Sequence, residues 1–402
     1  MNGVLNVTRK VGFKIGSNIL IYSFGIYLVY AIINVFANSI NGLPAFTNGV
    51  LLVARVAMYI LLFLGVAYAI INFKPMELAY VGGLLLLFTF NYLCYSNIPA
   101  RFSSYLNTFA FICFPLSLFA FRMNGDKILK TLELIGFISS VLYLAMLVGM
   151  LSGRLNMITY ATSVGYSALL PQIVIIHGSI QKKGVQRAIS VMAIVPYLLF
   201  VLLFGSRGPL FVVLFYITYE FMYFEYKAGS TKKIVFAIAT LILITALLLN
   251  AGDILSYVLQ LTGNRGINSR TLMLLSSDFT HSSGRDEIYQ TVISKIIEHP
   301  FTIRGIASDT EIIMGNQYVH NLFLELLYQF GIIFGGIASV FILYMWGKSV
   351  AFKTFEYDPF ETICAIVAII QLMISSSLWL NFVFWVWFAR RISSRNRNYK
   401  DI

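Results

Sequence analysis

Residues 282–305 read SSGRDEIYQTVISKIIEHPFTIRG, and residues 320–331 read HNLFLELLYQFG. The first segment carries basic and acidic side chains at helical spacing, and the second opens an apolar helix with a histidine and an asparagine. In the whole chain, 58% of the 402 residues are hydrophobic and only 11% are charged, whereas soluble domains have about 25% charged residues. This polar stretch is therefore an island between membrane segments.

Apolar runs of about 18 to 20 residues recur along the chain, and each is long enough to cross about 30 Å of hydrocarbon. The predicted fold is all-α: a polytopic membrane protein with about 12 transmembrane helices in a single integral membrane domain, residues 1–402. A membrane β-barrel would show short alternating segments instead. The stretch 360–390 is compatible with one span or two, and its serine-rich break favours two. The predicted spans are 19–37, 50–72, 78–95, 104–121, 131–151, 163–180, 188–204, 209–226, 234–250, 320–346, 360–376 and 378–390.

Lysine and arginine are distributed unevenly between the two sides that these spans define. With the N-terminus in the cytoplasm, the inner side carries 20 of the 29 basic residues, as the positive-inside rule predicts. The rule accounts for the net charge of +12 without nucleic-acid binding, and it places both termini in the cytoplasm. Eight of the nine outer cations are arginines, whose planar fork of donors suits bidentate phosphate binding. The nine are Arg55, Arg101, Arg154, Arg207, Arg265, Arg270, Arg285, Lys295 and Arg304.

The residues from about 251 to 319 are predicted to form one large extracytoplasmic loop. Within it, residues 284–298 carry an apolar stripe at helical spacing. Ser283 is a suitable N-cap, with Asp286 as its capping-box partner. The pattern predicts an amphipathic helix that lies on the membrane surface or covers the bundle.

A short glycine-rich turn, Gly205-Ser206-Arg207-Gly208-Pro209, lies between two apolar runs on the outer side. Glycine lets a ligand approach the backbone closely, and Pro209 suits the first turn of the following helix. Arg207 is then placed near a helix N-terminus, which favours anions. Ser206 and Gly208 are candidate substrate contacts beside it. The structural alternative is that these residues only form a turn, with Arg207 anchored at the membrane–water interface.

Two further sets of residues on the predicted outer side of the membrane are candidates for the active site. Ser283-Gly284-Arg285-Asp286 places another arginine at a helix start, with a solvated arginine as the structural alternative. His320 at a helix mouth is expected to have a near-neutral pKa and to act as a general base, although an interfacial histidine satisfied by water is common. Glu325, a little over one turn deeper, is a candidate because ionisable groups at membrane depth are often functional.

Arg55, Arg304 and Asn321 complete the candidate substrate contacts, and Arg55 lies where it could reach a lipid phosphate. The sequence has no paired-aspartate motif, no Cys/His cluster and no phosphate-binding glycine loop. We therefore predict no metal site and no cofactor, which leaves acid/base and electrostatic catalysis. The three cysteines lie in apolar runs and are interpreted as packing residues; they are Cys94, Cys113 and Cys364.

These motifs together resemble the O-antigen polymerase and ligase family. An S-R-G element precedes a mid-chain span, an S-G-R-x-x-x-Y helix is followed by H-P, and H-N-x-x-L-x-x-L-x-x-x-G opens a late span. Their order and shared outer side carry the resemblance. It covers the whole architecture of twelve predicted spans with one large late outer loop, and its specific motifs occupy residues 205–209, 283–305 and 320–331. Asp309 and Glu311, in the link between the last two segments, match no role in the family.

The resemblance implies a metal-independent glycosyltransferase at the outer face of the bacterial cytoplasmic (inner) membrane. It would polymerise undecaprenyl-diphosphate-linked oligosaccharide repeats into O-antigen, capsular polysaccharide or exopolysaccharide, with inversion. His320 would be the base, and Arg207 and Arg285 would stabilise the diphosphate. The alternatives are a ligase that passes the finished glycan to another acceptor, and a lipid-linked oligosaccharide flippase. The expected partners are the lipid-linked donor, the bilayer, a chain-length regulator and a flippase, whereas sugar identity, linkage and oligomeric state are left open.

Overall fold

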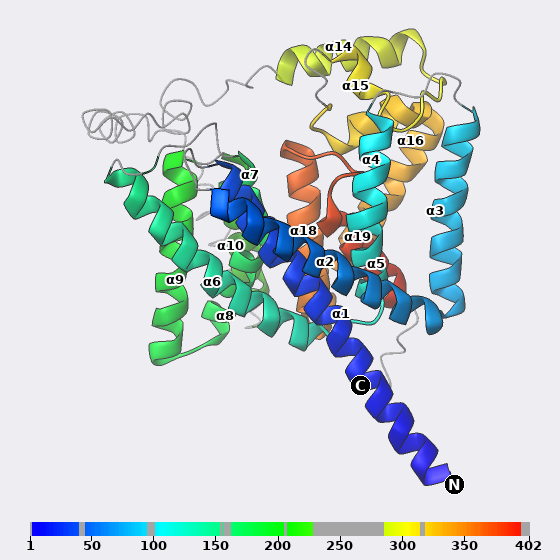
Figure 1. Ribbon diagram of the computed structural model, residues 1–402. Coiled ribbons are helices and arrows are strands. Elements are labelled where there is room, and N and C mark those ends of the chain that lie inside the picture. Colours follow the sequence, from blue (N-terminus) through cyan, green and yellow to red (C-terminus); the bar gives the residue numbers. More distant parts are fainter. Residues whose placement is uncertain are drawn as a thin grey trace. The chain divides into compact units, whose positions relative to one another are not determined.

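The computed structural model describes residues 2–39, 45–94, 101–152, 155, 162–204, 207–227, 285–313 and 318–394. Over these ranges the chain is helical and contains no β-strand (Figure 1). Seven helices in the same ranges are long and apolar enough to cross a membrane, and three shorter apolar helices accompany them. The protein is therefore an all-α polytopic membrane protein, as its composition predicts.

The candidate spans coincide with predicted ones. The long ones are Asn18–Asn38, Gly49–Ile71, Pro75–Leu93, Phe102–Ala120, Gly125–Met150, Gly184–Leu203 and Leu322–Ser349. The shorter ones are Leu169–Gln181, Gly208–Phe224 and Pro359–Ile374. The predicted span 378–390 overlaps the helix Phe382–Ser394, which is not among these candidate spans. The predicted span 234–250 and the loop residues 251–284 lie outside the described residues. The total of twelve spans therefore stays a prediction.

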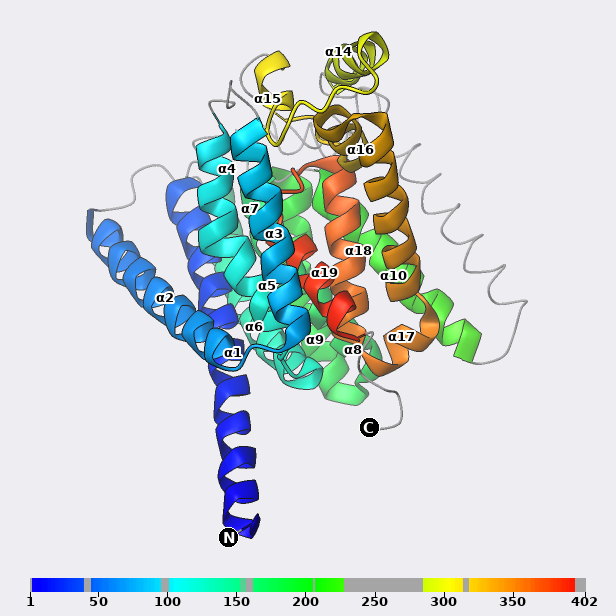
Figure 2. The same cartoon turned by 90° about the vertical axis from the view of Figure 1, so that its right-hand side faces the viewer.

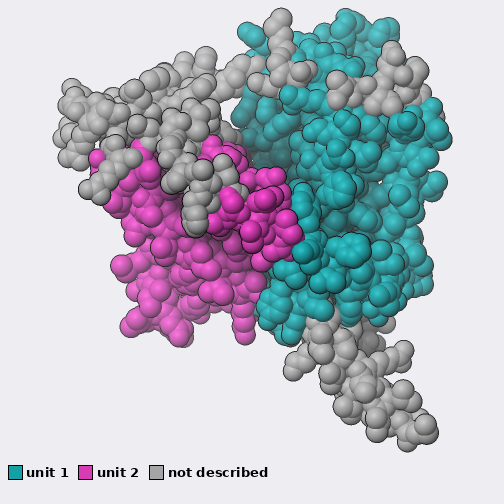
Figure 3. Space-filling model, viewed as in Figure 1, with its two compact units in different colours: residues 1–24, 59–128, 282–402 teal, residues 25–58, 129–281 magenta. Residues whose placement is uncertain are grey.

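The chain divides into two compact units, each assembled from segments that are distant in sequence (Figure 3). Three helices contribute to both units: α1 (Asn2–Ser39), α2 (Ala45–Ile71) and α6 (Gly125–Leu151). Unit 1 comprises residues 1–24, 59–128 and 282–402, and unit 2 comprises residues 25–58 and 129–281.

In unit 2, polar side chains of two apolar helices form hydrogen bonds with one another. Gly136 of α6 allows α8 to approach closely, because a Cβ there would lie 2.8 Å from the Pro171 carbonyl oxygen. The Gln172 amide nitrogen then donates to the Ser139 and Ser140 hydroxyls at 3.0 Å each, so these donors meet acceptors inside the apolar helices. The other helices of this unit are α7 (Thr162–Ser167), α8 (Leu169–Gln181), α9 (Gly184–Phe204) and α10 (Arg207–Lys227).

The core of unit 1 is built around α18 (Pro359–Ile374) and α19 (Phe382–Ser394), which pack against each other. Most of α18 is buried, and α19 also packs against α5 (Phe114–Ala120). Figure 2 shows these helices beside α3 (Pro75–Cys94) and α16 (Leu322–Ser349). The buried Arg390 pairs with Asp358 at 2.7 Å, which neutralises its charge inside the core. The short α17 (Phe352–Tyr357) connects α16 to α18.

Pro115 explains an interruption in the helix that spans residues 102–120. Helix α4 (Phe102–Thr108) passes into a π-helical turn, η1 (Phe109–Cys113), before α5 begins. A proline has no N–H, and its ring clashes with the carbonyl four residues earlier, here that of Phe111. The wider turn relieves this conflict, and the Phe114 N–H accordingly donates to the Phe109 carbonyl. Within this turn, Phe111 is exposed.

Helix α16 consists of two helical pieces joined at Gly331, whose φ of 72° suits glycine. The pieces contact each other closely, since a Cβ at Gly335 would lie 2.8 Å from the Leu327 Cα. Helix α14 (Arg285–Glu298) forms where the sequence predicts the amphipathic helix and lies across the end at which α16 begins (Figure 1). The one-turn α15 (Asp309–Ile312) lies in the segment between them. The bend and α14 together shape the candidate site.

Candidate active site

Helix α14 is held over the beginning of α16 by a small apolar cluster. The predicted stripe on residues 284–298 supplies the buried face of α14, and the segment after α14 supplies most of the rest. As a result, the first turn of α14 lies beside residues 318–321, which lead into α16. The cluster consists of Val292, Ile296, Ile313, Val319 and Tyr328.

Arg285 and His320 lie together at this helix mouth. The hydroxyl of Tyr289, one turn after Arg285, donates to the His320 carbonyl oxygen at 3.4 Å. The Tyr318 ring packs against the His320 imidazole with 4.2 Å between ring centroids. Arg285 is close enough for its charge to act on His320, Tyr289 and Tyr318. Two of the three predicted catalytic residues are therefore neighbours.

His320 shows two features that are typical of functional residues. Its φ of 56° lies in the left-handed region, which is unfavourable for a residue other than glycine and persists only where the surroundings enforce it. Its Nδ1 is buried and has no hydrogen-bond partner among the described residues. A buried polar atom without a partner is rare in folded proteins and is consistent with a role in ligand binding or catalysis.

The prediction of a near-neutral pKa for His320 is wrong. Burial and, to a smaller extent, the positive charge of Arg285 lower the pKa of His320 to about 4. The imidazole is therefore neutral at physiological pH and can accept a proton, but it is a weak base. An anion bound beside Arg285 would offset the arginine charge and raise the pKa of His320 towards the neutral range.

Asn321 starts the helix that follows His320. Its side-chain oxygen accepts from the backbone N–H groups of Phe323 and Leu324 at 3.1 Å each, as an N-cap residue does. This cap fixes where α16 begins and, through it, where His320 is placed. The Asn321 side-chain oxygen is thus occupied by the N-terminal N–H groups of α16, so only its NH₂ group is left for a substrate contact.

Arg304 has a structural role in the described geometry. Its guanidinium donates to the carbonyls of Lys295 at 2.7 Å and His299 at 3.1 Å, at the end of α14. It also donates to the Tyr328 carbonyl at 3.2 Å, where the first piece of α16 ends, and it lies 4.5 Å from the Tyr328 ring centroid. A cation here binds the last carbonyls of two helices. We therefore reassign Arg304 from substrate contact to a link between α14 and α16.

Glu325 is likewise turned inward, towards the turn between α18 and α19. It is 1% exposed. Its carboxylate accepts from the Ser377 hydroxyl at 2.5 Å, the Leu378 N–H at 3.0 Å and the Gln329 amide at 3.3 Å. It thus ties α16 to the turn between α18 and α19. This geometry does not support the interpretation of Glu325 as a substrate-binding residue, and no cation pairs with it among the described residues.

The remaining predicted residues belong to unit 2. Arg207 is the first residue of α10, and its side chain lies outside the described residues, as does Ser206. Gly208 is buried in the first turn of α10. Arg55 is exposed, and its Nε donates to the Tyr30 hydroxyl at 2.7 Å. The prediction that Arg207 joins Arg285 and His320 therefore stays a prediction.

Sequence reasoning does not single out Tyr318, it names Asp309 without assigning it a role, and it lists Tyr289 only as part of a motif. Tyr289 lies four residues after Arg285, so a helix places both on one face, and this spacing was a usable signal. No comparable signal marks Asp309, because its contacts depend on how the chain folds back.

A second polar cluster missed by the sequence reasoning lies in unit 2. His177 of α8 contacts the Glu220 carboxylate through Nδ1 at 2.9 Å and the Tyr216 hydroxyl at 3.1 Å. Its Nε2 lies 2.9 Å from the Gln181 amide nitrogen. His177 and Glu220 are both buried inside apolar helices.

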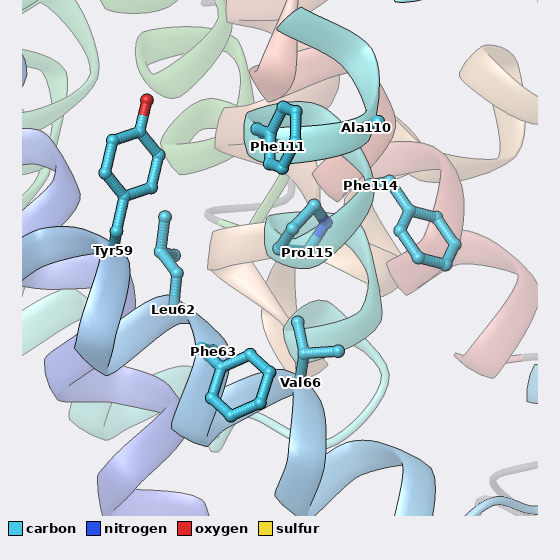
Figure 4. Close-up of a pocket in the computed structure, with 8 residues that line it drawn as sticks. All are labelled: Tyr59, Leu62, Phe63, Val66, Ala110, Phe111, Phe114 and Pro115. Carbon is cyan, nitrogen blue, oxygen red and sulfur yellow. The ribbon is translucent and has the colours of Figure 1, made fainter. Parts of the chain in front are cut away.

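An apolar groove of about 500 Å³ lies within unit 1, between α2 and the π-helical region (Figure 4). Its walls are aromatic and aliphatic, and among the described residues that line it Tyr59 alone has a polar side-chain group. Phe63 and Phe111 on the two sides are 72% and 59% exposed, so exposed apolar side chains of two candidate spans border the groove. The lining residues are Tyr59, Leu62, Phe63, Val66, Ala110, Phe111, Phe114 and Pro115.

No group of three or more His, Cys, Asp or Glu side chains that could hold a metal ion occurs in the part of the chain that the structure describes. Comparisons with protein-family models, with curated proteins and with solved structures find no match for this chain. The function is therefore argued from the site.

Proposed function

We propose that the protein is a membrane glycosyltransferase that polymerises undecaprenyl-diphosphate-linked oligosaccharide repeats at the outer face of the bacterial inner membrane. The observation that carries the proposal is the pairing of Arg285 with a strained, partly buried His320 at a helix mouth beside a candidate span. A general base next to a fixed cation suits a reaction in which a hydroxyl attacks and a phosphate group leaves. Both termini lie in the cytoplasm in this proposal.

The chemical step is a direct displacement at the anomeric carbon of the donor. A hydroxyl oxygen of the acceptor forms the new glycosidic bond while the bond from the anomeric carbon to the diphosphate oxygen breaks. The hydroxyl proton passes to the neutral His320 imidazole, and the bonding electrons leave with the diphosphate. Arg285 stabilises the charge that develops on the leaving group, and attack from the opposite face inverts the anomeric configuration.

Binding of the donor also prepares the base. The diphosphate is strongly anionic, so its arrival beside Arg285 would raise the pKa of His320 above about 4. The base therefore becomes stronger when the substrate is in place. The charge pattern of the sequence alone assigns Arg207 to the donor diphosphate, because it puts this arginine on the outer side of the membrane, and Arg55 to lipid phosphate.

The apolar groove supports a donor that carries a long hydrocarbon chain. Its lining offers no charged group, and it is continuous with the lipid-facing surfaces of Phe63 and Phe111. A polyprenyl chain could enter it sideways from the bilayer without crossing water. We assign the groove to the polyprenyl part of the donor.

The test uses purified full-length protein and lipid-linked repeats extracted from cells that lack this gene. We expect a ladder of longer lipid-linked chains, formed with EDTA present, from the wild type but not from His320→Ala. His299→Ala is the matched control, because His299 is an exposed histidine of the same segment whose backbone carbonyl contact with Arg304 survives the substitution. Equal ladders from the two variants would remove His320 from the mechanism.

The same preparation separates the alternatives. A ligase would leave the lipid-linked repeats unextended and transfer glycan only when a different acceptor is added. A transporter is the second candidate, and the buried His177–Glu220 pair favours it, because ionisable groups inside a membrane often carry protons or ions. A transporter would move intact donor across proteoliposomes, would lose this activity in His177→Leu, and would form no new glycosidic bond.

A further inference from the structure

The left-handed backbone of His320 requires that the residues beside it are held firmly. On its C-terminal side, Asn321 caps α16. On its N-terminal side, the fully buried Val319 is held by a side chain from another part of the loop. The Val319 N–H donates to the Asp309 Oδ2 at 3.2 Å. Asp309 thus acts on the residue directly before the proposed base.

Asp309 is itself fixed on its other side. It is 0% exposed, and its Oδ1 accepts from the Gln329 amide at 2.8 Å. The Gln329 oxygen in turn accepts from the Trp379 indole N–H at 2.8 Å. Asp309 therefore connects the backbone beside His320 to the first piece of α16 and to the turn before α19.

Only a carboxylate meets both contacts. The two oxygens of Asp309 each face an N–H donor, one from Val319 and one from Gln329. An asparagine has the same shape, but it offers one acceptor and one NH₂ group. In either orientation its NH₂ group would point at an N–H, so one contact is lost and a buried donor is left unpaired.

We propose that Asp309 is a positioning residue for His320: its carboxylate holds the Val319 N–H and thereby keeps the His320 backbone in its left-handed conformation at the mouth of α16. The role does not require Asp309 to touch substrate. Its kinetic consequence rests on the proposed function, whereas its effect on the His320 side chain does not.

The first experiment therefore measures His320 without any substrate. Full-length Asp309→Asn and wild-type protein are treated with diethyl pyrocarbonate, and mass spectrometry follows modification of His320 relative to His299 in the same molecule. We expect the ratio to rise several-fold in Asp309→Asn, because the released segment exposes the imidazole. The exposed His299 corrects for differences in reagent and detergent.

Asn91→Ala is the matched control. The Asn91 side chain is buried and also accepts a backbone N–H from the same loop, that of Ile306, at 2.8 Å. A general loosening of the loop would raise the His320 ratio in both variants, and that result would overturn the proposal. An unchanged ratio in Asp309→Asn would overturn it as well.

A second variant covers the case in which Asp309→Asn does not fold. Gln329→Met removes the other contact of Asp309 but leaves the Val319 contact in place, so we expect a smaller rise in the same direction. No rise in Gln329→Met would then count against the proposal.

The second experiment is kinetic. With lipid-linked repeats, Asp309→Asn should lower kcat on the order of ten- to a hundredfold with little change in KM, since the base is misplaced while donor contacts remain. A raised KM with unchanged kcat would contradict positioning of the base. If the wild type extends no glycan at all, the proposed function fails, and the His320 modification ratio still decides the role of Asp309.

Discussion

Replacing Arg304 with alanine distinguishes a structural cation from a substrate contact. The guanidinium holds three carbonyls from the ends of two helical segments, at 2.7, 3.1 and 3.2 Å. Each such hydrogen bond contributes about 1 kcal/mol net. The Tyr328 ring at 4.5 Å adds about 0.5 kcal/mol. Because Arg304 is only half-buried, water can replace part of these interactions. We therefore expect Arg304→Ala to weaken the junction between the end of α14 and the first piece of α16 by about 2 kcal/mol.

Hydrogen exchange measures this junction directly. A loss of about 2 kcal/mol in local stability corresponds to about 30-fold faster exchange where opening is local, and we expect it in peptides covering residues 295–305. Arg304→Lys should recover only part of the protection, because one ammonium group cannot reach carbonyls of both helices. Lys295→Ala is the control, since that exposed side chain contacts only Glu298 among the described acidic groups and should not change the exchange.

The opposite result would refute this reasoning. If Arg304→Ala leaves exchange in residues 295–305 unchanged but raises KM for the lipid-linked donor, the arginine contacts substrate, as the sequence alone suggests. Full recovery of KM by Arg304→Lys would strengthen that conclusion.

Three other predictions follow from the same geometry. Gly335→Ala should destabilise the protein by about 1–3 kcal/mol through overpacking, since its Cβ would meet backbone atoms, whereas Gly336→Ala faces open space and should be neutral in thermal unfolding. The free-enzyme pH profile should stay flat down to about pH 5 and fall as pH drops through about 4, because the His320 pKa is lowered and only neutral imidazole accepts a proton; a loss centred near pH 6.5 would contradict the burial argument. Arg285→Gln should raise the pKa of His320, measured by the pH dependence of its modification, because the substitution removes a neighbouring positive charge, and it should slow glycan extension on the order of 10²–10³-fold.

Much of the architecture follows from local sequence features. Apolar runs of spanning length predict the helices because hydrocarbon leaves backbone groups no partner outside the helix. The stripe on residues 284–298 predicts α14, since its period matches the helix turn. Ser375–Ser377 predict the break after α18, which the structure places at Ser375. Each feature acts over a few residues, so the linear chain is sufficient to reveal it.

The site was predicted less completely, because its decisive contacts join distant residues. Glu325 and Arg304 read as ligand contacts in the sequence, but their partners Ser377 and Tyr328 lie 52 and 24 residues away. The pKa of His320 depends on burial and on Arg285, which is 35 residues earlier in the chain. Neither the burial of His320 nor its closeness to Arg285 can be read from the spacing of residues along the chain.

The sequence by itself determines that this is a helical membrane protein with a polar segment before a late helix, because composition and periodicity act locally. It also places Arg285 and His320 at the starts of two helices. Only the tertiary structure decided that these two helix starts are neighbours, that Arg304 and Glu325 serve the scaffold, and that Asp309 lies behind His320. The physical reason is that burial, electrostatic shifts and buried hydrogen bonds arise from the packing of α14 against α16, which brings distant segments of the chain together.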